Sequence, residues 1–411
     1  MSSSASDAHD PSPIAVRLSV AWGTWGTSGG IYTPFVGAWL AYTGMRPVEI
    51  GALLSTGMLL RVIVPPITGI VADARDDRRS MMIALMAIQL VCWGALNFLL
   101  SPLEIFVLVV TSNAAGGAAG PLLESVSMRL AERFGFDYGR VRLWNSISFA
   151  LSNVISGFAI SRWGMTVFVP WLTVSLALTF TSVCFLPPPP PGASKGQLRV
   201  RLAATFAEAR ELAGSGVFLL FLLAASFDQG SHAFYYSYGS LHWQSLGYSG
   251  AVIGAIWPLG IIAEAALFSV SLRVFRAVGA TRLLLLGGIG CVLRWTILAL
   301  DPPFVLVVFA QFLHGATFAL AHLGAMYFVL KAVPQRLAAT AQSLYAVGSN
   351  GIVMGLATFA SGPLYEAYGG RTYLLMAAMG VVAAAFALWL GRVWQGGRIT
   401  GSAGDDAFDA I

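Results

Sequence analysis

Ionisable side chains are rare in this chain, and a few of them lie in the middle of long apolar stretches. An Arg or Asp near the bilayer centre costs about 2.5–3.5 kcal/mol in insertion experiments, so such residues persist where they pair or line a water-filled cavity. The set contains three acids and, with one base that begins an apolar stretch, three bases: Glu124, Asp228, Glu264, Arg61, Arg294 and Arg142. This balance favours a shared polar interior with a functional role over ion pairs that only hold helices together.

The rest of the composition indicates the solvent around this interior. Of 411 residues, 57% are apolar and 10% are charged, whereas a soluble domain carries about 25% charged residues. A soluble fold and a disordered chain are both excluded, since the first needs more surface charge and the second would be poor in apolar residues. The apolar runs are long and do not alternate, so we expect an all-α polytopic membrane protein.

Apolar runs between charged or turn-rich breaks predict twelve membrane-spanning helices. We place them at residues 15–41, 48–72, 80–100, 104–130, 141–162, 164–186, 215–240, 249–273, 282–300, 304–330, 337–361 and 372–394. With a cytoplasmic N-terminus, 19 Lys and Arg residues lie on the cytoplasmic side, three lie outside and two lie within spans, which accounts for all 24. This bias follows the positive-inside rule and predicts that both termini are cytoplasmic.

The chain divides near its middle at a run of five prolines, Pro187–Pro191, which cannot continue a helix. The polar segment that follows contains an amphipathic stretch, residues 197–212, which we expect to lie on the cytoplasmic membrane surface. The predicted domains are a cytoplasmic tail at 1–14, a six-helix bundle at 15–186, a cytoplasmic linker at 187–214, a second six-helix bundle at 215–394 and a cytoplasmic tail at 395–411. Repeated halves around a site at the midplane are a recurrent plan of secondary transporters.

Aromatic side chains recur at helical spacing near the buried charges. Trp25 and Tyr32 share one face of a predicted helix, and Asp228, His232 and Tyr235 share a face at spacings of four and three. Such stripes usually pack against neighbouring helices or form an interface belt, but Trp25, Tyr32 and Tyr235 lie deep enough to face a cavity. We therefore treat these three as candidate binding residues.

Histidines and cysteines form no pattern typical of a metal site or a catalytic centre. His314 and His322 are about 12 Å apart along one helix, too far to bind one metal ion together. No H-x-x-x-H, H-E-x-x-H or nucleophile-elbow pattern occurs, and the three cysteines lie in apolar runs. We expect no enzymatic activity, no metal and no cofactor, and a proton-relay or hydrogen-bonding role for the histidines.

Residues 69–79, between the second and third predicted spans, read GIVADARDDRR. This segment resembles the G-x-x-x-D-R-x-G-R-R signature of the major facilitator superfamily, although Ala74 replaces a base and the second glycine is missing. The resemblance implies a gating motif on the cytoplasmic face made of Gly69, Asp73, Arg78 and Arg79. Physically, an acid near a helix end is placed to hold neighbouring Arg side chains.

Longer stretches are similar to the bacterial 3-phenylpropionate permease group, which is related to lactose permease. They read FDYGRVRLW at 136–144, HAFYY at 232–236 with GYS at 247–249, VLRW at 292–295 and LHGATF at 313–318. The resemblance covers about residues 15–390. It implies the major facilitator fold, with twelve helices in two six-helix bundles, and secondary active transport by alternating access.

The relationship to lactose permease also implies roles for matching positions in the N-terminal half. An acid in the fourth span, 18 residues before an Arg that opens the fifth, binds substrate there, and Glu124 and Arg142 keep this spacing. An aromatic residue seven positions beyond the Arg stacks on the substrate, and Phe149 occupies that position.

In the C-terminal half, the resemblance implies proton coupling by an acid in the eighth span, an Arg in the ninth and a His 20 residues later. Glu264, Arg294 and His314 occupy these places. The relative has a proton-carrying Glu three residues after the His, where this chain has Thr317, whose hydroxyl has no useful pKa. Either Glu264 takes over proton carriage, with its protonation releasing its hold on Arg294, or coupling is weaker than in the relative.

A second candidate for proton carriage is Asp228. Asn350 occupies the position of a Lys in the relative, so Asp228 lacks that cationic partner, and His232 lies one turn away from it. The sequence leaves both acids open.

Together, the residues and the resemblance predict proton-coupled uptake of a small organic substrate, an aromatic monocarboxylate such as 3-phenylpropionate. A buried carboxylate needs a cation, for which Arg142, Arg61 and Arg294 are candidates, and aromatic walls suit a ring. A sugar or nucleoside proton symporter is the alternative, and a membrane enzyme or receptor is a distant one. We expect a monomer in the bacterial cytoplasmic (inner) membrane, with the substrate, the proton and the lipid bilayer as partners and without nucleic acid.

Overall fold

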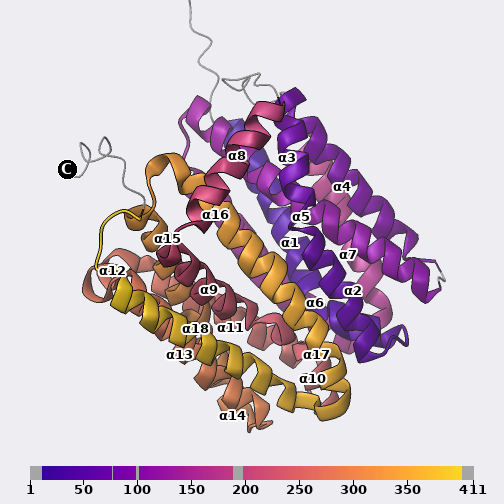
Figure 1. Cartoon of the computed structure of the whole chain (residues 1–411). Coiled ribbons are helices and arrows are strands. Elements are labelled where there is room, and N and C mark those ends of the chain that lie inside the picture. The colour runs from indigo at the N-terminus through magenta and orange to yellow at the C-terminus, as the bar shows by residue number, and fades with distance from the viewer. Residues whose placement is uncertain (1–11, 76, 99–100, 188–197, 400–411) are drawn as a thin grey trace, which may run out of the picture.

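The computed structural model describes residues 12–75, 77–98, 101–187 and 198–399, and this part of the chain is helical and contains no strand (Figure 1). Nine stretches of it are long and apolar enough to cross a membrane by length and composition. One of them, Gln335–Val393, has 59 residues, and a single crossing takes only about 20. The all-α membrane class is therefore confirmed, while the count of twelve crossings stays a prediction.

The helices before the undescribed segment 188–197 are called the N-terminal half. They are α1 Ser12–Tyr42, α2 Pro47–Leu60, α3 Val64–Arg75, α4 Arg78–Ala95, α5 Pro102–Phe134, α6 Tyr138–Trp163, the short η1 Met165–Val167 and α7 Phe168–Cys184. Local sequence sets several ends. Ser101 and Glu104 form a capping box that begins α5, Gly135 ends it with a φ of 71°, and Asp137 caps α6.

The helices after that segment form the C-terminal half. They are α8 Leu198–Ala213, α9 Gly216–Gly230, α10 Ala233–Ser245, α11 Gly250–Ser269, α12 Ser271–Val278, α13 Ala280–Ala299, α14 Phe304–Phe312, η2 Gly315–Leu320, α15 Ala321–Ala332, η3 Gln335–Leu337, α16 Ala338–Ala346, η4 Val347–Val353, α17 Met354–Tyr368, η5 Gly369–Thr372 and α18 Tyr373–Val393. Helix occupies most of each of the twelve predicted intervals. The predicted domain boundaries stay predictions.

Two of the predicted spans are not continuous helices. The interval 48–72 is interrupted at Arg61–Ile63, because Pro65 and Pro66 have no N–H to donate to the carbonyls of Arg61 and Val62. The interval 215–240 is interrupted at Ser231 and His232. Two other segments, η2 and η4, are π-helical, a local irregularity that is frequent at functional sites. The intervals 48–72 and 215–240 therefore each contain two helical segments joined by a turn.

The predicted amphipathic helix corresponds to α8, which contacts the C-terminal half through side chains. Glu211 accepts hydrogen bonds from Arg336 of η3 at 2.9 and 2.5 Å, and Thr340 of α16 donates to Glu208. The hydrogen bonds from Arg336 lower the pKa of Glu211. Phe206 on the same helix is exposed. Part of α8 is therefore fixed to the protein through its acidic residues.

The two halves contact each other closely where α1 ends and α2 begins, a region we call the seam. In Figure 1, α17 of the C-terminal half runs close to α2 of the other half, and α11 packs against α6. Tyr238 donates to the Pro47 carbonyl at 2.8 Å, and the Ala251 N–H donates to Ser161 at 2.8 Å. A Cβ on Gly37 would lie 1.8 Å from the Ser237 carbonyl oxygen. The seam is therefore a close backbone-to-backbone contact that only small residues permit.

Candidate functional site

Three cavities of about 330, 270 and 250 Å³ lie among the described helices and share lining residues. The first cavity lies within the N-terminal half, lined from α1, α4, α5, α7 and the end of α2. The second and third cavities lie between the two halves. Thr33 of α1 lines all three, so the cavities form one branched system around that helix.

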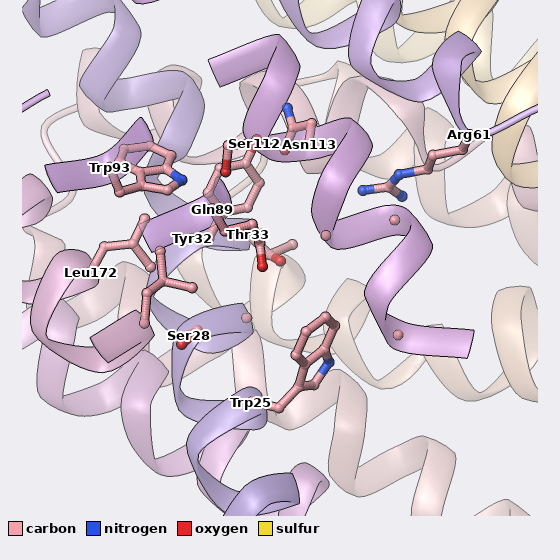
Figure 2. A pocket seen from close by; sticks show the side chains of 15 residues that line it. Trp25, Ser28, Tyr32, Thr33, Arg61, Gln89, Trp93, Ser112, Asn113 and Leu172 are labelled. Atoms are coloured by element: carbon pink, nitrogen blue, oxygen red, sulfur yellow. Dashed lines mark hydrogen bonds between the residues drawn. The ribbon is translucent and has the colours of Figure 1, made fainter. Parts of the chain in front are cut away.

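The first cavity brings together three of the predicted binding residues: Trp25, Tyr32 and Arg61. In the view of Figure 2, Arg61 enters from the right, and Tyr32 and Trp93 lie to the left. Tyr32 donates a hydrogen bond to the Asn113 amide oxygen at 2.9 Å. Aromatic, amide and guanidinium groups therefore line one compartment.

Glycines of α5 make room for this cavity. A Cβ on Gly116 would lie 2.3 Å from the Gln89 amide nitrogen, and one on Gly117 would lie 2.9 Å from Arg61 Cγ. Glycine-rich helix faces usually serve close helix packing. Here both glycines line the cavity and leave space for polar side chains.

The second cavity brings together predicted residues from both halves. Its lining includes six of them: Arg142, Phe149, Tyr235, Glu264, Arg294 and His314. Two come from α6 of the N-terminal half, and the others come from α10, α11, α13 and the turn before η2. Positions up to 172 residues apart in sequence therefore meet around one space between the halves.

The predicted pair of Glu124 and Arg142 forms. Arg142 Nε lies 3.8 Å from Glu124 Oε2, and Tyr138 donates a short hydrogen bond to the same carboxylate. The Arg142 guanidinium also lies over the Trp22 ring, 4.4 Å from its centre. Both partners of the pair are partly exposed, so Arg142 is an ion-paired cation at the edge of the second cavity.

Arg294 is the most enclosed cation of the site and is completely buried. Its guanidinium donates to His314 Nδ1 at 2.9 Å, to Thr317 at 3.1 Å and to the Gln311 amide oxygen at 3.4 Å. It also lies over the rings of Tyr235 and Trp295, at 4.8 and 4.5 Å. Hydrogen bonds and rings on several sides fix this guanidinium in place.

Glu264 reaches Arg294 only through histidine. Its Oε2 lies 3.8 Å from His314 Nε2, and the opposite ring nitrogen of His314 accepts from Arg294. That acceptor role places the remaining imidazole proton on Nε2, toward Glu264. In this structure, His314 therefore lies between Glu264 and Arg294.

Asp228 and His232 lie beside this cluster, behind the cavity wall. Both side chains are completely buried, and neither lines the three cavities. Asp228 Oδ1 lies 3.5 Å from Cys291 Sγ, whereas His232 Nε2 lies 3.1 Å from the Thr317 hydroxyl. The interruption between α9 and α10 lies between Asp228 and Tyr235, yet Asp228, His232 and Tyr235 all contact residues of α13.

The predicted gating residues connect helices within the N-terminal half. Gly69 and Asp73 lie on α3, and the side chain of Asp73 is outside the described part. Arg79 donates to the carbonyls of Leu186 and Cys184 at the end of α7, at 2.6 and 2.5 Å. Such bonds satisfy carbonyls that have no partner within the helix.

The other basic residue of this motif joins α4 to α5, since Arg78 donates a short hydrogen bond to Ser125. Asp77 caps α4 by accepting from the Ser80 N–H at 2.9 Å. Hydrogen bonds from Ser80 lower the pKa of Asp77. The motif therefore ties three helices together at one end of the half.

Several lining residues were not among the predicted site residues. Five of them are amides inside apolar helices: Gln89, Asn113, Asn145, Gln229 and Asn350. An amide buried in an apolar medium without a partner costs about 2–7 kcal/mol, so its presence in an apolar run was a usable signal. No group of three or more His, Cys, Asp or Glu side chains able to hold a metal occurs among the described residues.

Two bundles of apolar helices around a branched polar interior define a multi-pass membrane transporter of the major facilitator type, a non-enzymatic class. Residues 25–376 match the model of the MFS_1 like family, and the chain belongs to that family.

Two relatives of known class support this placement. A probable 3-phenylpropionic acid transporter of Escherichia coli (strain K12) is 27% identical over 368 residues, 88% of this chain and 93% of that protein. A maltose permease of Geobacillus stearothermophilus is 27% identical over 345 residues, 84% of this chain and 86% of that protein.

Among solved structures, a crystal structure of a nucleoside transporter has a TM-score of 0.80 at 19% identity, over 92% of this chain and 99% of that chain. At these identities the likeness shows the fold alone.

Proposed function

We propose that the protein takes up a small organic substrate with protons by alternating access, and that the substrate is an aromatic monocarboxylate such as 3-phenylpropionate. One observation carries the proposal: three guanidinium groups, those of Arg61, Arg142 and Arg294, line cavities whose walls also contain Trp and Tyr rings. A guanidinium binds a carboxylate through two charge-assisted hydrogen bonds, and the aromatic walls cover the ring. The E. coli relative named as a probable 3-phenylpropionic acid transporter supports this choice.

Proton coupling is assigned to the chain of Glu264, His314 and Arg294. Protonation of Glu264 neutralises its charge and weakens its attraction for the His314 ring, which in turn accepts from Arg294. The cluster thereby has two protonation states that differ in net charge. Each state favours a different conformation of the two halves. Asp228 remains a second proton carrier in this scheme, acting through Cys291 and the α9–α10 interruption.

Orientation follows from the positive-inside bias, which places both termini in the cytoplasm of a bacterial inner membrane. The seam then lies on the outer side, and the arrangement corresponds to a transporter closed outside and facing inward. The moving units are the two six-helix bundles, 15–186 and 215–394, acting in a monomer. Rocking of one bundle against the other about the central cavities exchanges access between the two sides.

A sugar or nucleoside proton symporter is a second candidate. Amide and hydroxyl groups in the first cavity, among them Gln89, Asn113 and Ser112, suit a substrate with many hydroxyl groups. The maltose permease relative favours the same alternative.

The test is uptake by full-length protein in proteoliposomes with an imposed inward proton gradient. Labelled 3-phenylpropionate, maltose and a nucleoside are compared in parallel, each with and without a protonophore. We expect accumulation of 3-phenylpropionate above the external concentration and its loss with the protonophore. Accumulation of maltose or the nucleoside instead, with no uptake of the acid, would show that the protein is a sugar or nucleoside symporter.

A further inference from the structure

We propose that the substrate carboxylate is held by Arg61 in the first cavity, inside the N-terminal half, and not by Arg142 or Arg294. The chemical class of the substrate, a carboxylate with an apolar body, rests on the proposed function. The location of the anion site follows from differences between the contacts of the three guanidinium groups.

Contacts made by the guanidinium group separate Arg61 from the other two, although Arg294 has only neutral acceptors and its Nε is buried without a partner. Arg142 has an ion pair with Glu124 and a ring contact, and Arg294 has three hydrogen-bond acceptors and two ring contacts. Within the described part of the chain, the Arg61 guanidinium has no hydrogen bond, ion pair or ring contact, although Arg61 is an exposed residue lining two cavities. A cation inside a membrane-spanning region persists when something compensates it. An anionic ligand supplies that compensation.

The backbone places Arg61 at a fixed depth for this role. Arg61 lies near the middle of the predicted span 48–72 and caps the C-terminal end of α2. Because Pro65 and Pro66 interrupt the helix after it, the side chain leaves from a turn between α2 and α3. Discontinuous helices near the midplane are where secondary transporters bind their substrates.

The first cavity also supplies further donors for a carboxylate, which can only accept hydrogen bonds. The Asn113 amide oxygen is used by Tyr32, which leaves the amide N–H groups of Asn113 to donate into the cavity. Gln89 also lines this cavity and carries amide N–H donors, whereas its Oε1, which is buried without a partner, is an acceptor and offers nothing to a carboxylate. Trp25 and Trp93 provide apolar walls beside these groups.

The Arg61 pocket is continuous with the space between the halves. Arg61, Tyr32, Thr33 and Asn113 line the third cavity as well as the first. A substrate anchored at Arg61 therefore extends its body toward the interface that alternating access opens and closes. This position lets binding in one half affect the contact between both.

The experiment compares binding of 3-phenylpropionate and its neutral amide, 3-phenylpropionamide, to the full-length protein in detergent by titration calorimetry. Wild type, Arg61→Gln and Gly117→Ala are measured, and Gly94→Ala is the matched control. A Cβ on Gly117 would lie 2.9 Å from Arg61 Cγ, whereas one on Gly94 meets nothing within 4 Å. Gly117→Ala therefore displaces the Arg61 side chain without removing its charge.

We expect Arg61→Gln to weaken acid binding by at least about tenfold, as loss of hydrogen bonds to a charged group does. Binding of the amide should be nearly unchanged, so the preference for the acid disappears. Gly117→Ala should weaken acid binding less, and Gly94→Ala should match wild type. An Arg61→Gln protein that keeps the preference for the acid overturns the inference while leaving the proposed function intact. A wild type that binds no acid rejects the proposed function itself, and the inference with it.

Discussion

Each half contains an arginine within a predicted span, and the two arginines differ in what surrounds them. Arg294 in the C-terminal half is completely buried and has hydrogen bonds to His314, Thr317 and Gln311. Arg61 in the N-terminal half faces a cavity, and no hydrogen bond or ion pair reaches its guanidinium from the described residues. A guanidinium that is hydrogen-bonded to protein groups can respond to protonation of its neighbours. A guanidinium without such partners is available to bind an anionic ligand. Under the proposed function, this difference leads us to infer recognition in the N-terminal half and coupling in the C-terminal half.

Backbone irregularity follows the same division. The N-terminal half has one interrupted span, at Arg61–Ile63, directly beside the open guanidinium. The C-terminal half has an interruption at Ser231 and His232 and the π-helices η2 and η4, all close to the coupling residues. Irregular backbone in a membrane is tolerated where it is buried in protein or lines a cavity. The site residues are therefore positioned by departures from regular helix.

The largest effect is expected at the ion pair of Glu124 and Arg142, because Arg142 lines the cavity between the two halves. Replacing either residue by alanine leaves its partner as an unpaired charge beside the second cavity. We expect uptake of 3-phenylpropionate to fall to background in both variants, measured in proteoliposomes. Equal amounts of protein in the membrane fraction serve as the control for insertion. Near-normal uptake by either variant would remove the pair from the transport site and leave the comparison to Arg61 and Arg294.

A smaller effect tests how tightly the coupling region is bonded. The Thr317 hydroxyl lies 3.1 Å from both His232 Nε2 and the Arg294 guanidinium, so Thr317→Val leaves a buried acceptor and a buried donor without this partner. We expect a loss of about 1–3 kcal/mol in the free energy of unfolding, seen as a lower melting temperature in detergent. Thr33→Val is the matched variant in the open region, because Thr33 lines all three cavities without a side-chain hydrogen bond to the described residues. Equal melting temperatures for the two variants would contradict the distinction.

The smallest effect concerns the contact of α8 with the C-terminal half. Hydrogen bonds from Arg336 lower the pKa of Glu211 in the folded protein, so the contact stabilises the protein above the unfolded pKa of about 4.3 and is lost as the pH falls below it. Glu211→Gln should lower the melting temperature slightly at neutral pH and not at strongly acidic pH. A difference that stays constant across the pH range would show that the ion pair does not contribute.

Hydropathy and charge bias were enough to predict most helices of this fold, because lipid-facing spans need long apolar runs. Pro65 and Pro66 also indicate the interruption after Arg61. Hydropathy alone did not predict it, because the apolar run has the length of one ordinary span. The sequence predicted that Glu264, His314 and Arg294 belong to one cluster. It did not predict that His314 lies between the other two side chains. That order depends on how the side chains before η2 turn toward the cavity, a tertiary detail that spacing along the chain does not contain. Single amides such as Gln89 were not predicted, because candidate residues within apolar runs were chosen by their charge.

In the proposed mechanism, Arg61 recognises the substrate and Glu264 couples its transport to the proton. The most direct measurement compares Arg61→Gln and Glu264→Gln in the same proteoliposomes, in two modes: accumulation driven by a proton gradient, and exchange of labelled for unlabelled 3-phenylpropionate without a gradient. We predict that Glu264→Gln loses accumulation and keeps exchange, whereas Arg61→Gln loses both. Unchanged accumulation by Glu264→Gln, or exchange at the wild-type rate by Arg61→Gln, would contradict this division between the halves.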